Sequence, residues 1–272
     1  MAGFNSISAD KLARLIGTPA CPLLLDVGVG GEALIPGARR RDADSVARWA
    51  AGLGSRPAVI SCADGTRESP AVAAWLRQCG IGAETLEGGV AGWAAAGLPL
   101  VREALLPPRD EAGRTLWVTR SRPKVDRIAC PWLIRRFVDP DAVFLFVAPS
   151  EVAGAAERLG AAPFDVEGVF WSHRGELCTF DVMVDELGLG ALPALGHLAT
   201  IVRGADTARP ELAPQAAGLL ALSLGLSRMH GDDHAQLEAG MPLYDAFYRW
   251  CRDAVDETHD WVSHRPGARV RR

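Results

Sequence analysis

A cysteine at the end of a short apolar run is the residue whose surroundings most favour chemistry. Cys62 ends this run, and Ser69 and Pro70 supply an N-cap and a first helical residue seven positions later. Backbone N–H groups in the intervening loop, the helix dipole and Arg67 would together stabilise an anionic sulfur, and Gly65 suits a tight loop. Placement at a strand end should also expose the thiol. The pattern predicts a thiolate that accepts sulfane sulfur and holds it as a persulfide.

A basic segment is the second candidate, because charge-assisted hydrogen bonds from such a cluster hold an oxyanion. A helix N-terminus expected near residues 129–131 would assist it. The alternative is a solvated basic face, although apolar neighbours such as Trp132 place part of the set near a core. The cluster contains Arg120, Arg122, Lys124, Arg127, Arg135 and Arg136.

Histidine and carboxylate residues gather in three later segments, FWSHRGELCTFD, RGADT and MHGDDHAQLE. These side chains can supply ligands to a divalent or ferric metal ion. Asp232 has another use as a helix N-cap, and a purely structural polar network is an equally open interpretation. The candidate ligands are His173, Asp206, Asp233 and His234.

The cysteine loop is expected in a first domain, residues 5–103, where short apolar runs alternate with helical stretches. This alternation predicts an α/β fold with a parallel sheet flanked by helices. Helices are expected at 9–16, 45–52 and 70–79, and strands at 23–27 and 58–62. Residues 104–114, which carry two prolines, a glycine and a cluster of charges, are expected to form a linker.

A second domain, residues 115–262, is expected to be mainly helical α+β with a small sheet. Branched and aromatic residues predict strands at 115–123 and 142–149, and a hairpin is expected from 168–173 and 176–184. Helices are expected at 131–138, 192–202, 214–229, 233–238 and 242–258. Residues 263–272 should form a flexible basic tail.

Composition limits the class of protein. The chain has 272 residues, 49% of them hydrophobic, and a formal net charge of -4. Such a chain is an ordinary globular protein without a basic surface spread over the whole molecule, which argues against nucleic-acid binding. No stretch suits a signal peptide or a membrane helix, and the six scattered cysteines are best interpreted as thiols. We therefore expect a cytoplasmic protein with no membrane partner.

The cysteine loop and its flanks resemble the rhodanese-type sulfurtransferase family. Members carry a six-residue loop that opens with the catalytic Cys and closes with Arg, and here Cys62, Gly65 and Arg67 fall on that pattern. Related phosphatases use a loop one residue longer, so sulfur is favoured over phosphate. By this resemblance Asp64 and Thr66 would line the substrate loop. The matching segments are LLLDV, IPGA, CADGTR and LEGGVAGWAAAGLP.

Two departures from the rhodanese pattern bear on activity. Ala63 and Gly28 replace arginines that are frequent in the family, and Asp64 and Glu68 add negative charge beside the thiol. These carboxylates oppose thiolate formation and repel anionic donors. A rhodanese fold with weak or altered activity is therefore an alternative.

From about residue 115 to residue 260 the chain is similar to the C-terminal domain of ChrB-type chromate-resistance proteins. The resemblance implies a role in chromate resistance, by sensing chromate or by assisting its handling. Chromate is a tetrahedral dianion, so the basic cluster is chemically apt, with Lys124, Arg127 and Arg135 as binding candidates. The matching segments are KVDRIACPWLIRRFVDP, PFDVEGVFWSHRGELCTFD, IVRGADT, LAPQAAGLLALSLGLSRMHGDDHAQLE and LYDAFYRWCRD.

Two functions follow from these resemblances. The first is a sulfurtransferase that uses a small-molecule sulfur donor and works with a domain that binds an oxyanion such as chromate, or a metal. The second is a chromate-responsive sensor or regulatory protein in which the rhodanese module is weakly active or inactive. No helix-turn-helix is legible in the sequence, so DNA binding is not expected. The sequence indicates no cofactor apart from the metal ion and no oligomeric state.

Overall fold

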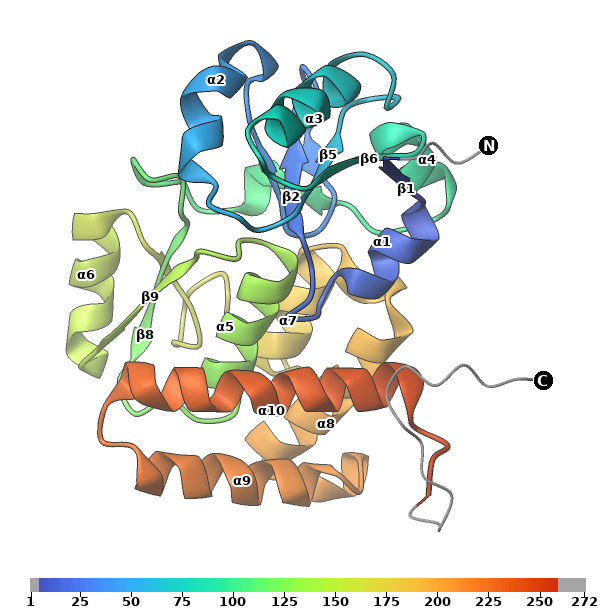
Figure 1. Cartoon of the computed structure of the whole chain (residues 1–272). Coiled ribbons are helices and arrows are strands. Elements are labelled where there is room, and N and C mark those ends of the chain that lie inside the picture. Colours follow the sequence, from blue (N-terminus) through green and yellow to red (C-terminus); the bar gives the residue numbers. More distant parts are fainter. Residues whose placement is uncertain (1–4, 259–272) are drawn as a thin grey trace.

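Short parallel strands organise the first domain of the computed structural model, which describes residues 5–258 (Figure 1). They form a five-stranded sheet in the order β1-β6-β5-β2-β4, and all of its pairings are parallel. The strands are β1 Ser6–Ile7, β2 Leu23–Asp26, β4 Ala38–Arg40, β5 Ala58–Ser61 and β6 Ala83–Leu86. A two-stranded antiparallel sheet pairs β3 Ala33–Leu34 with β7 Val101–Arg102.

Helices cover both faces of the five-stranded sheet. Leu25 and Ile60 on adjacent strands face an apolar cluster that includes Val72 and Leu76 of α3. Their chain neighbours Leu24 and Val59 point to the opposite face and into the main core. The expected α/β class with a parallel sheet is confirmed. The helices of this domain are α1 Ala9–Leu15, α2 Val46–Trp49, α3 Glu68–Gln78 and α4 Gly89–Ala95.

The second domain packs helices around a small parallel sheet of order β10-β8-β9, which confirms the mainly helical α+β expectation. Its strands are β8 Leu116–Arg120, β9 Val143–Val147 and β10 Ala162–Pro163. Its helices are α5 Asp126–Phe137, α6 Val152–Leu159, α7 Thr179–Glu186, α8 Pro193–Asp206, α9 Ala216–Met229 and α10 Asp233–Asp253. Short 3-10 turns of the whole chain are η1 Ala43–Ser45, η2 Ala50–Gly52, η3 Glu103–Leu105, η4 Pro149–Glu151, η5 Leu189–Ala191 and η6 Pro210–Leu212.

Three expectations for the second domain were wrong. The predicted hairpin is a loop followed by α7, because Phe180, Met183 and Val184 recur at helical spacing and are all buried. The predicted helix at 131–138 begins earlier, at Asp126, with Pro131 inside it. The two helices expected at 233–238 and 242–258 are the single helix α10. In both helices tertiary packing outweighs the missing N–H of the internal proline.

Helix α5 lies at the centre of the molecule, between the first domain and helices α7, α8 and α10 (Figure 1). Its Trp132 ring is surrounded by four other aromatic rings at centroid distances of 5.5–6.4 Å. The carbonyl of Phe137 accepts a hydrogen bond of 2.6 Å from the N–H of Gly37 in the first domain. The main core is therefore shared by the two domains.

The segment expected to be a linker begins in η3, and a single bridge pairs Arg109 with Thr115. The domain limits proposed from the sequence stay predictions. The tail at 263–272 and the end of the second domain at 262 lie outside the described residues. Within residues 5–258, no helix combines the length and the apolar character that crossing a bilayer requires.

Candidate metal centre and cysteine loop

The first residue of α5 is a carboxylate that is completely buried. Asp126 follows Val125, whose φ of +37° marks a sharp turn between β8 and the helix. Its Oδ2 accepts a hydrogen bond of 2.6 Å from the N–H of Thr179, which starts α7. Its Oδ1 has no hydrogen-bond partner among the described residues. Because an unpaired buried carboxylate oxygen is costly, this position calls for a proton or a cation.

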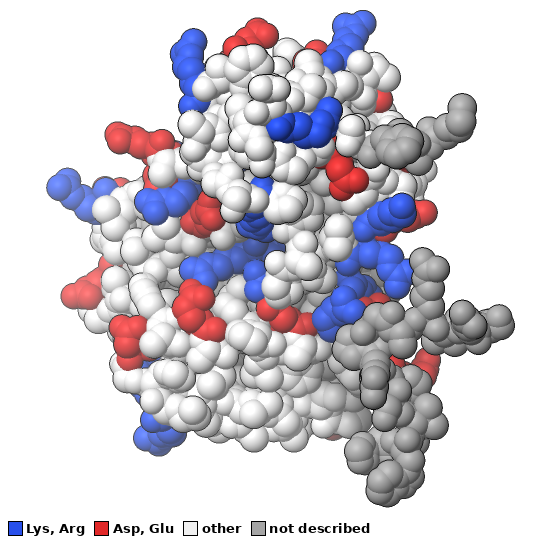
Figure 2. Space-filling model, viewed as in Figure 1, with Lys and Arg blue, Asp and Glu red and all other residues white. Residues whose placement is uncertain are grey.

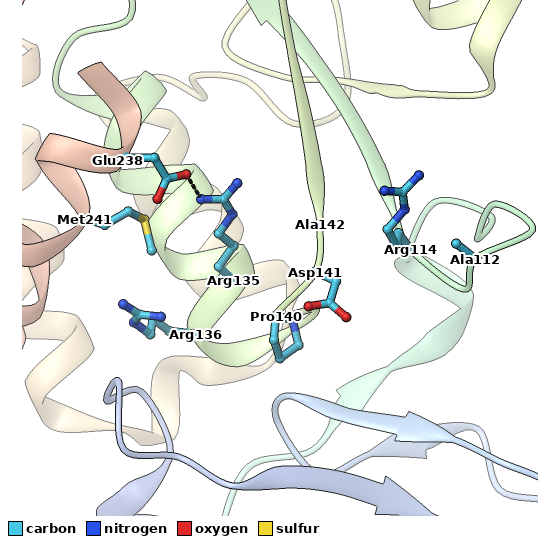
Figure 3. Close-up of a pocket in the computed structure, with 9 residues that line it drawn as sticks. All are labelled: Ala112, Arg114, Arg135, Arg136, Pro140, Asp141, Ala142, Glu238 and Met241. Carbon is cyan, nitrogen blue, oxygen red and sulfur yellow. Dashed lines mark hydrogen bonds and ion pairs between the residues drawn. The ribbon is translucent and has the colours of Figure 1, made fainter. Parts of the chain in front are cut away.

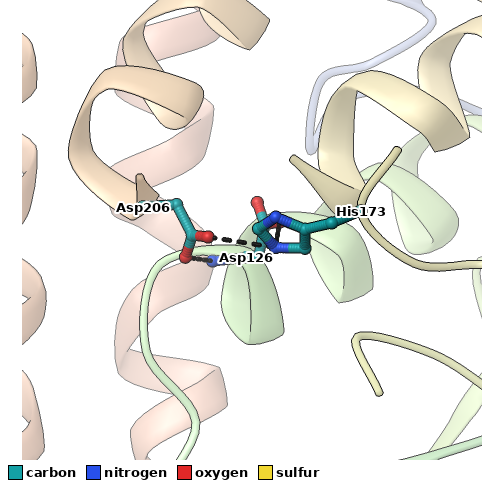
Figure 4. Close-up of side chains that lie close together, drawn as sticks. All are labelled: Asp126, His173 and Asp206. Atoms are coloured by element: carbon teal, nitrogen blue, oxygen red, sulfur yellow. Dashed lines mark hydrogen bonds and ion pairs between the residues drawn. The ribbon is translucent and has the colours of Figure 1, made fainter. Parts of the chain in front are cut away.

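The imidazole of His173 lies among three carboxylates, one of which is that of Asp126. The Nε2 atom of His173 lies 3.3 Å from Oδ2 of Asp206, 3.4 Å from Oδ1 of Asp165 and 3.5 Å from Oδ2 of Asp126. Figure 4 shows Asp126, His173 and Asp206 pointing toward one another. The first starts α5, the second lies in the loop before α7, and the third ends α8. Three separate segments of the second domain thus converge on one point.

The electrostatics of this cluster favour a positive charge at its centre. Burial, reinforced by the neighbouring carboxylates of Asp206 and Asp165, raises the pKa of Asp126 well above its usual value. The hydrogen bond to Asp165 raises the pKa of His173 to about 9 in spite of its partial burial, and the charges of Asp126 and Asp206 add to this effect. Without another cation, protons therefore compensate the cluster at neutral pH.

Asp165 differs from the other two carboxylates because arginines already neutralise it. Its Oδ2 lies 3.1 Å from Arg120 and 3.3 Å from Arg127, and its Oδ1 accepts a hydrogen bond of 2.9 Å from the hydroxyl of Thr179. Burial acts to raise the pKa of Asp165, but the bonds from His173 and Thr179 and the two guanidinium groups lower it overall. Asp165 therefore supports the cluster, while Asp126 and Asp206 remain for a cation.

The spacing of the ligand atoms suits a small divalent ion. Asp126, His173 and Asp206 each offer one ligand atom, and these atoms lie within 4.8 Å of one another. Metal bonds of about 2.1 Å to nitrogen and oxygen place tetrahedral ligands roughly 3.4 Å apart. The observed separations from His173 Nε2, 3.3 Å to Asp206 and 3.5 Å to Asp126, match that edge. An imidazole with two carboxylates suits Zn²⁺, Mn²⁺ or Fe²⁺.

Solvent and small ligands reach this cluster from one side. A pocket of about 320 Å³ opens beside it and is lined by residues that include Arg120, Asp165, Ser172 and His173. The side chain of His173 is 40% exposed, whereas that of Asp126 is fully buried. A metal ion held by these residues would therefore be accessible to small ligands through the side of His173, as catalytic and ligand-binding metal sites require.

The structure brings together only two of the four candidate ligands named from the sequence. It places His173 and Asp206 together, but Asp233 accepts a hydrogen bond from the backbone of Arg122, and the ring of His234 packs 5.4 Å from that of Phe146. Sequence reasoning missed Asp126 and Asp165. The available signal for Asp126 was a carboxylate directly before an apolar helix, a pattern that a helix N-terminus explains equally well.

The residues of the basic cluster also lie apart from one another in the structure. Arg127 donates to the carbonyls of Arg120 and Ser121 and pairs with Asp165, so most of its donors are occupied. Lys124 is exposed, and Arg135 lies at the other end of α5 from the metal cluster. The three oxyanion candidates therefore do not form one site.

The cysteine loop departs from the expected exposure. The side chain of Cys62 is fully buried and packs in the apolar cluster with Ile60, Val72 and Ala73. Its Sγ lies 3.2 Å from Oγ of Ser69, which is inside α3 and is not an N-cap as expected. The prediction that strand-end placement would expose the thiol was wrong, because α3 begins before Ser69 and brings its first turn over the sulfur.

The rest of the loop is held against α4. The carbonyls of Cys62 and Ala63 accept hydrogen bonds of 3.0 and 2.9 Å from Val90 and Ala91 at the start of that helix. Oδ1 of Asp64 accepts from both the N–H and the hydroxyl of Thr66, which closes the turn. Gly65 has a φ of +78°, as a tight loop requires, and Arg67 is exposed. A cavity of about 260 Å³ lies beside Ala63 and the first turn of α4.

Replacing Gly89 with Ala should destabilise the first domain by about 2 kcal/mol or more. A Cβ at this position would lie 2.2 Å from the carbonyl oxygen of Cys62, and the φ of +58° disfavours a side chain. Gly97 provides a matched control because its φ is +71° and no atom lies within 4 Å of its Cβ position. Urea unfolding followed by circular dichroism should show a clearly smaller loss for Gly97→Ala. Equal losses would mean that contact with the cysteine loop is unimportant.

Comparison with known proteins shows what the second domain is similar to. Residues 117–251 match the family model described as ChrB, C-terminal domain. Over 151 residues the chain is 32% identical to Protein ChrB of Cupriavidus metallidurans, a match that covers 53% of this chain and 43% of that protein. The chain thus spans less than half the length of this curated relative.

Solved structures similar to this chain cover its N-terminal third. A rhodanese-related protein from Thermoplasma volcanium is 25% identical, with a TM-score of 0.33, and the match covers 36% of this chain and 98% of that one. A rhodanese-like domain protein from Staphylococcus aureus is 27% identical, with a TM-score of 0.30, and covers 33% of this chain and 91% of its own.

Proposed function

We propose that this protein is a chromate-linked metalloprotein with a sulfur-accepting module, because residues 117–251 match the ChrB C-terminal domain model and the first domain resembles rhodanese-like structures. In this proposal Asp126, His173 and Asp206 bind a divalent metal ion. The observation that carries it is the unpartnered Oδ1 of the buried Asp126 beside the imidazole of His173. A cation there would compensate the charge of this buried carboxylate.

Each residue of the centre has a distinct task. Asp126 and Asp206 supply negative charge, and neutral His173 supplies a nitrogen ligand once its proton is released. Arg120 and Arg127 hold Asp165 in place and neutralise it. A metal ion held by these residues would supply a Lewis acid beside the adjoining pocket, able to polarise a water molecule.

Metal analysis of the purified protein tests this proposal. After incubation with Zn²⁺, Mn²⁺ or Fe²⁺ and desalting, we expect one metal ion per chain in the wild-type protein. His173→Ala should weaken binding by more than the roughly 10–100-fold that loss of an outer-shell partner costs. His230→Ala is the matched control, because His230 lies outside the metal cluster and its hydrogen bonds with Leu226 and Arg122 are made by its backbone. Equal metal content in the two variants would refute the metal centre.

The first domain supports a second function, sulfur transfer at Cys62. The loop is fixed by α4 on one side and faces a cavity of about 260 Å³ beside Ala63, which provides room for a small donor. The Cys62 thiolate would attack the outer sulfur of a donor such as thiosulfate, forming the S–S bond of a persulfide and releasing sulfite. Since the thiol is buried against Ser69, the loop must open before this attack.

Intact-mass measurement after incubation with thiosulfate separates the two functions considered for the first domain. A gain of one sulfur atom, lost in Cys62→Ser and kept in Cys79→Ser, supports the sulfurtransferase. Cys79 is a suitable control because its thiol is exposed and lies outside the loop. No gain with any sulfane donor, with metal binding intact, would favour the chromate-responsive sensor with an inactive rhodanese module.

A further inference from the structure

A basic pocket lies between the two domains, at the end of α5 opposite the metal centre. Figure 2 shows Lys and Arg side chains gathered along the waist of the molecule, between the first domain and α10. Two adjoining cavities occur here, and both are lined by Arg135, Arg136 and Pro140. We call them together the interdomain pocket.

The smaller cavity, of about 160 Å³, contains residues of both domains. The first domain contributes Arg56, Cys21 and Gly37 among others, and the second contributes the end of α5 and Pro140. No carboxylate lines it among the described residues. The larger cavity, of about 610 Å³, is also lined by Arg114 and Glu238 (Figure 3). The smaller cavity thus has three guanidinium groups on its wall.

The guanidinium groups of the smaller cavity retain free N–H donors. Arg56 uses one nitrogen, Nη2, to donate to the carbonyl of Cys21. Arg135 donates through Nη1 to Glu238, and Arg136 donates through Nε and Nη2 to Asp245. Each guanidinium carries five N–H donors on three nitrogens, so within the described part of the chain at least one nitrogen of each arginine is left without a protein acceptor.

The carboxylates around the interdomain pocket are already engaged. Asp245 binds Arg136 in a bidentate pair with two bonds of 2.8 Å, and Glu238, whose side chain is 64% exposed, binds Arg135. Asp141 lines the larger cavity, but its carboxylate is paired with Arg39, which does not line either cavity. Positive charge therefore remains at Arg56 and on the free edges of the two α5 arginines.

We propose that the smaller cavity binds a small tetrahedral oxyanion dianion, with Arg56 of the first domain and Arg135 of the second as its principal partners. Its volume equals that of about five water molecules at roughly 30 Å³ each, enough for an anion of five heavy atoms. Guanidinium forks match the oxygen spacing of such anions. This inference gives the oxyanion part of the proposed function a location and does not depend on the metal centre.

Both domains contribute donors, so the anion links them. Each binds it through charge-assisted hydrogen bonds, and the linkage is lost if the first domain separates from α5. Occupancy should therefore raise the temperature of unfolding, since a ligand that binds only the folded arrangement stabilises it.

Calorimetric titration of the full chain with sulfate, phosphate and chromate, at matched ionic strength in chloride, tests the inference. We expect saturable binding of at least one of these anions to the wild-type protein. Arg56→Gln and Arg135→Gln should each weaken it about tenfold or more, the effect of losing a hydrogen bond from a charged group. Arg158→Gln is the matched control because Arg158 is an exposed arginine near the end of α6, outside the pocket lining.

The two proposals give distinguishable outcomes. His173→Ala should lose metal and keep oxyanion binding, whereas Arg135→Gln should lose oxyanion binding and keep metal. Unchanged affinity in both pocket variants, or an equal loss in Arg158→Gln, would overturn the pocket proposal. Arg56 is exposed and makes a single hydrogen bond within residues 5–258, so Arg56→Gln should fold normally, which an unchanged circular dichroism spectrum would verify.

Discussion

Replacing Asp126 with Asn should make the metal-free protein more stable and at the same time strongly weaken its binding of divalent metal ions. The amide is nearly isosteric and still accepts the hydrogen bond from Thr179, but it removes a carboxylate that is buried beside Asp165 and Asp206. Relief of this burial and repulsion should stabilise the metal-free protein by about 1 kcal/mol. Loss of a charged ligand should weaken metal binding beyond the roughly 100-fold upper range for outer-shell partners.

The opposite signs of these two effects distinguish a binding site from a structural network. Thermal unfolding with and without metal gives the stabilities, and metal analysis gives the occupancy. Asp245→Asn is the matched control, because Asp245 is largely buried and bonded to Arg136 and Trp132. It should be less stable than the wild-type protein and bind metal normally. If Asp126→Asn is instead destabilising in the absence of metal, the role of Asp126 is to stabilise the folded protein and not to bind metal.

The parts of the fold that were predicted from the sequence are those in which local periodicity and tertiary packing agree. The strand containing Ile60 is buried throughout because both faces of a parallel sheet are covered. The hairpin prediction failed at Phe180, where β-branched and aromatic residues suggested a strand although their burial follows a helix. Two helices were predicted in place of α10 because a proline such as Pro242 usually ends a helix. That local preference does not include the tertiary packing that holds the two halves of α10 together.

The metal cluster shows where sequence reasoning reaches its limit. His173 and Asp206 were named from residue type, but their partner Asp126 lies 47 positions before the histidine, in a segment interpreted only for its positive charge. Spacing along the chain indicates ligands only when one helix or loop carries them. Here three elements meet through packing around α5, so the set becomes visible only in the folded molecule.

Replacing Asp139 with Ala should destabilise the folded protein by about 3–5 kcal/mol, the typical effect of breaking a buried ion pair. Asp139 is fully buried and lies 2.5 Å from Arg39 of the first domain and 3.2 Å from Arg109. It also accepts hydrogen bonds from the N–H and the hydroxyl of Thr115. Removing it leaves Arg109 without its carboxylate partner and Arg39 with only the exposed Asp141. Asp141→Ala is the control, since Asp141 pairs with Arg39 but is 58% exposed, and it should cost at most about 1 kcal/mol.

The contribution of Asp139 should also disappear in acid. Burial acts to raise the pKa of Asp139, but the bonds from Thr115 and the charges of Arg39 and Arg109 outweigh it and lower the pKa below its usual value. The stabilisation is therefore complete above the unfolded pKa of about 3.9 and declines as the pH falls through the lower folded value. Urea unfolding of the wild-type protein and Asp139→Ala should give free energies that converge below about pH 3.9. A difference that stays constant down to pH 2 would mean that the loss arises from packing and not from the ion pairs.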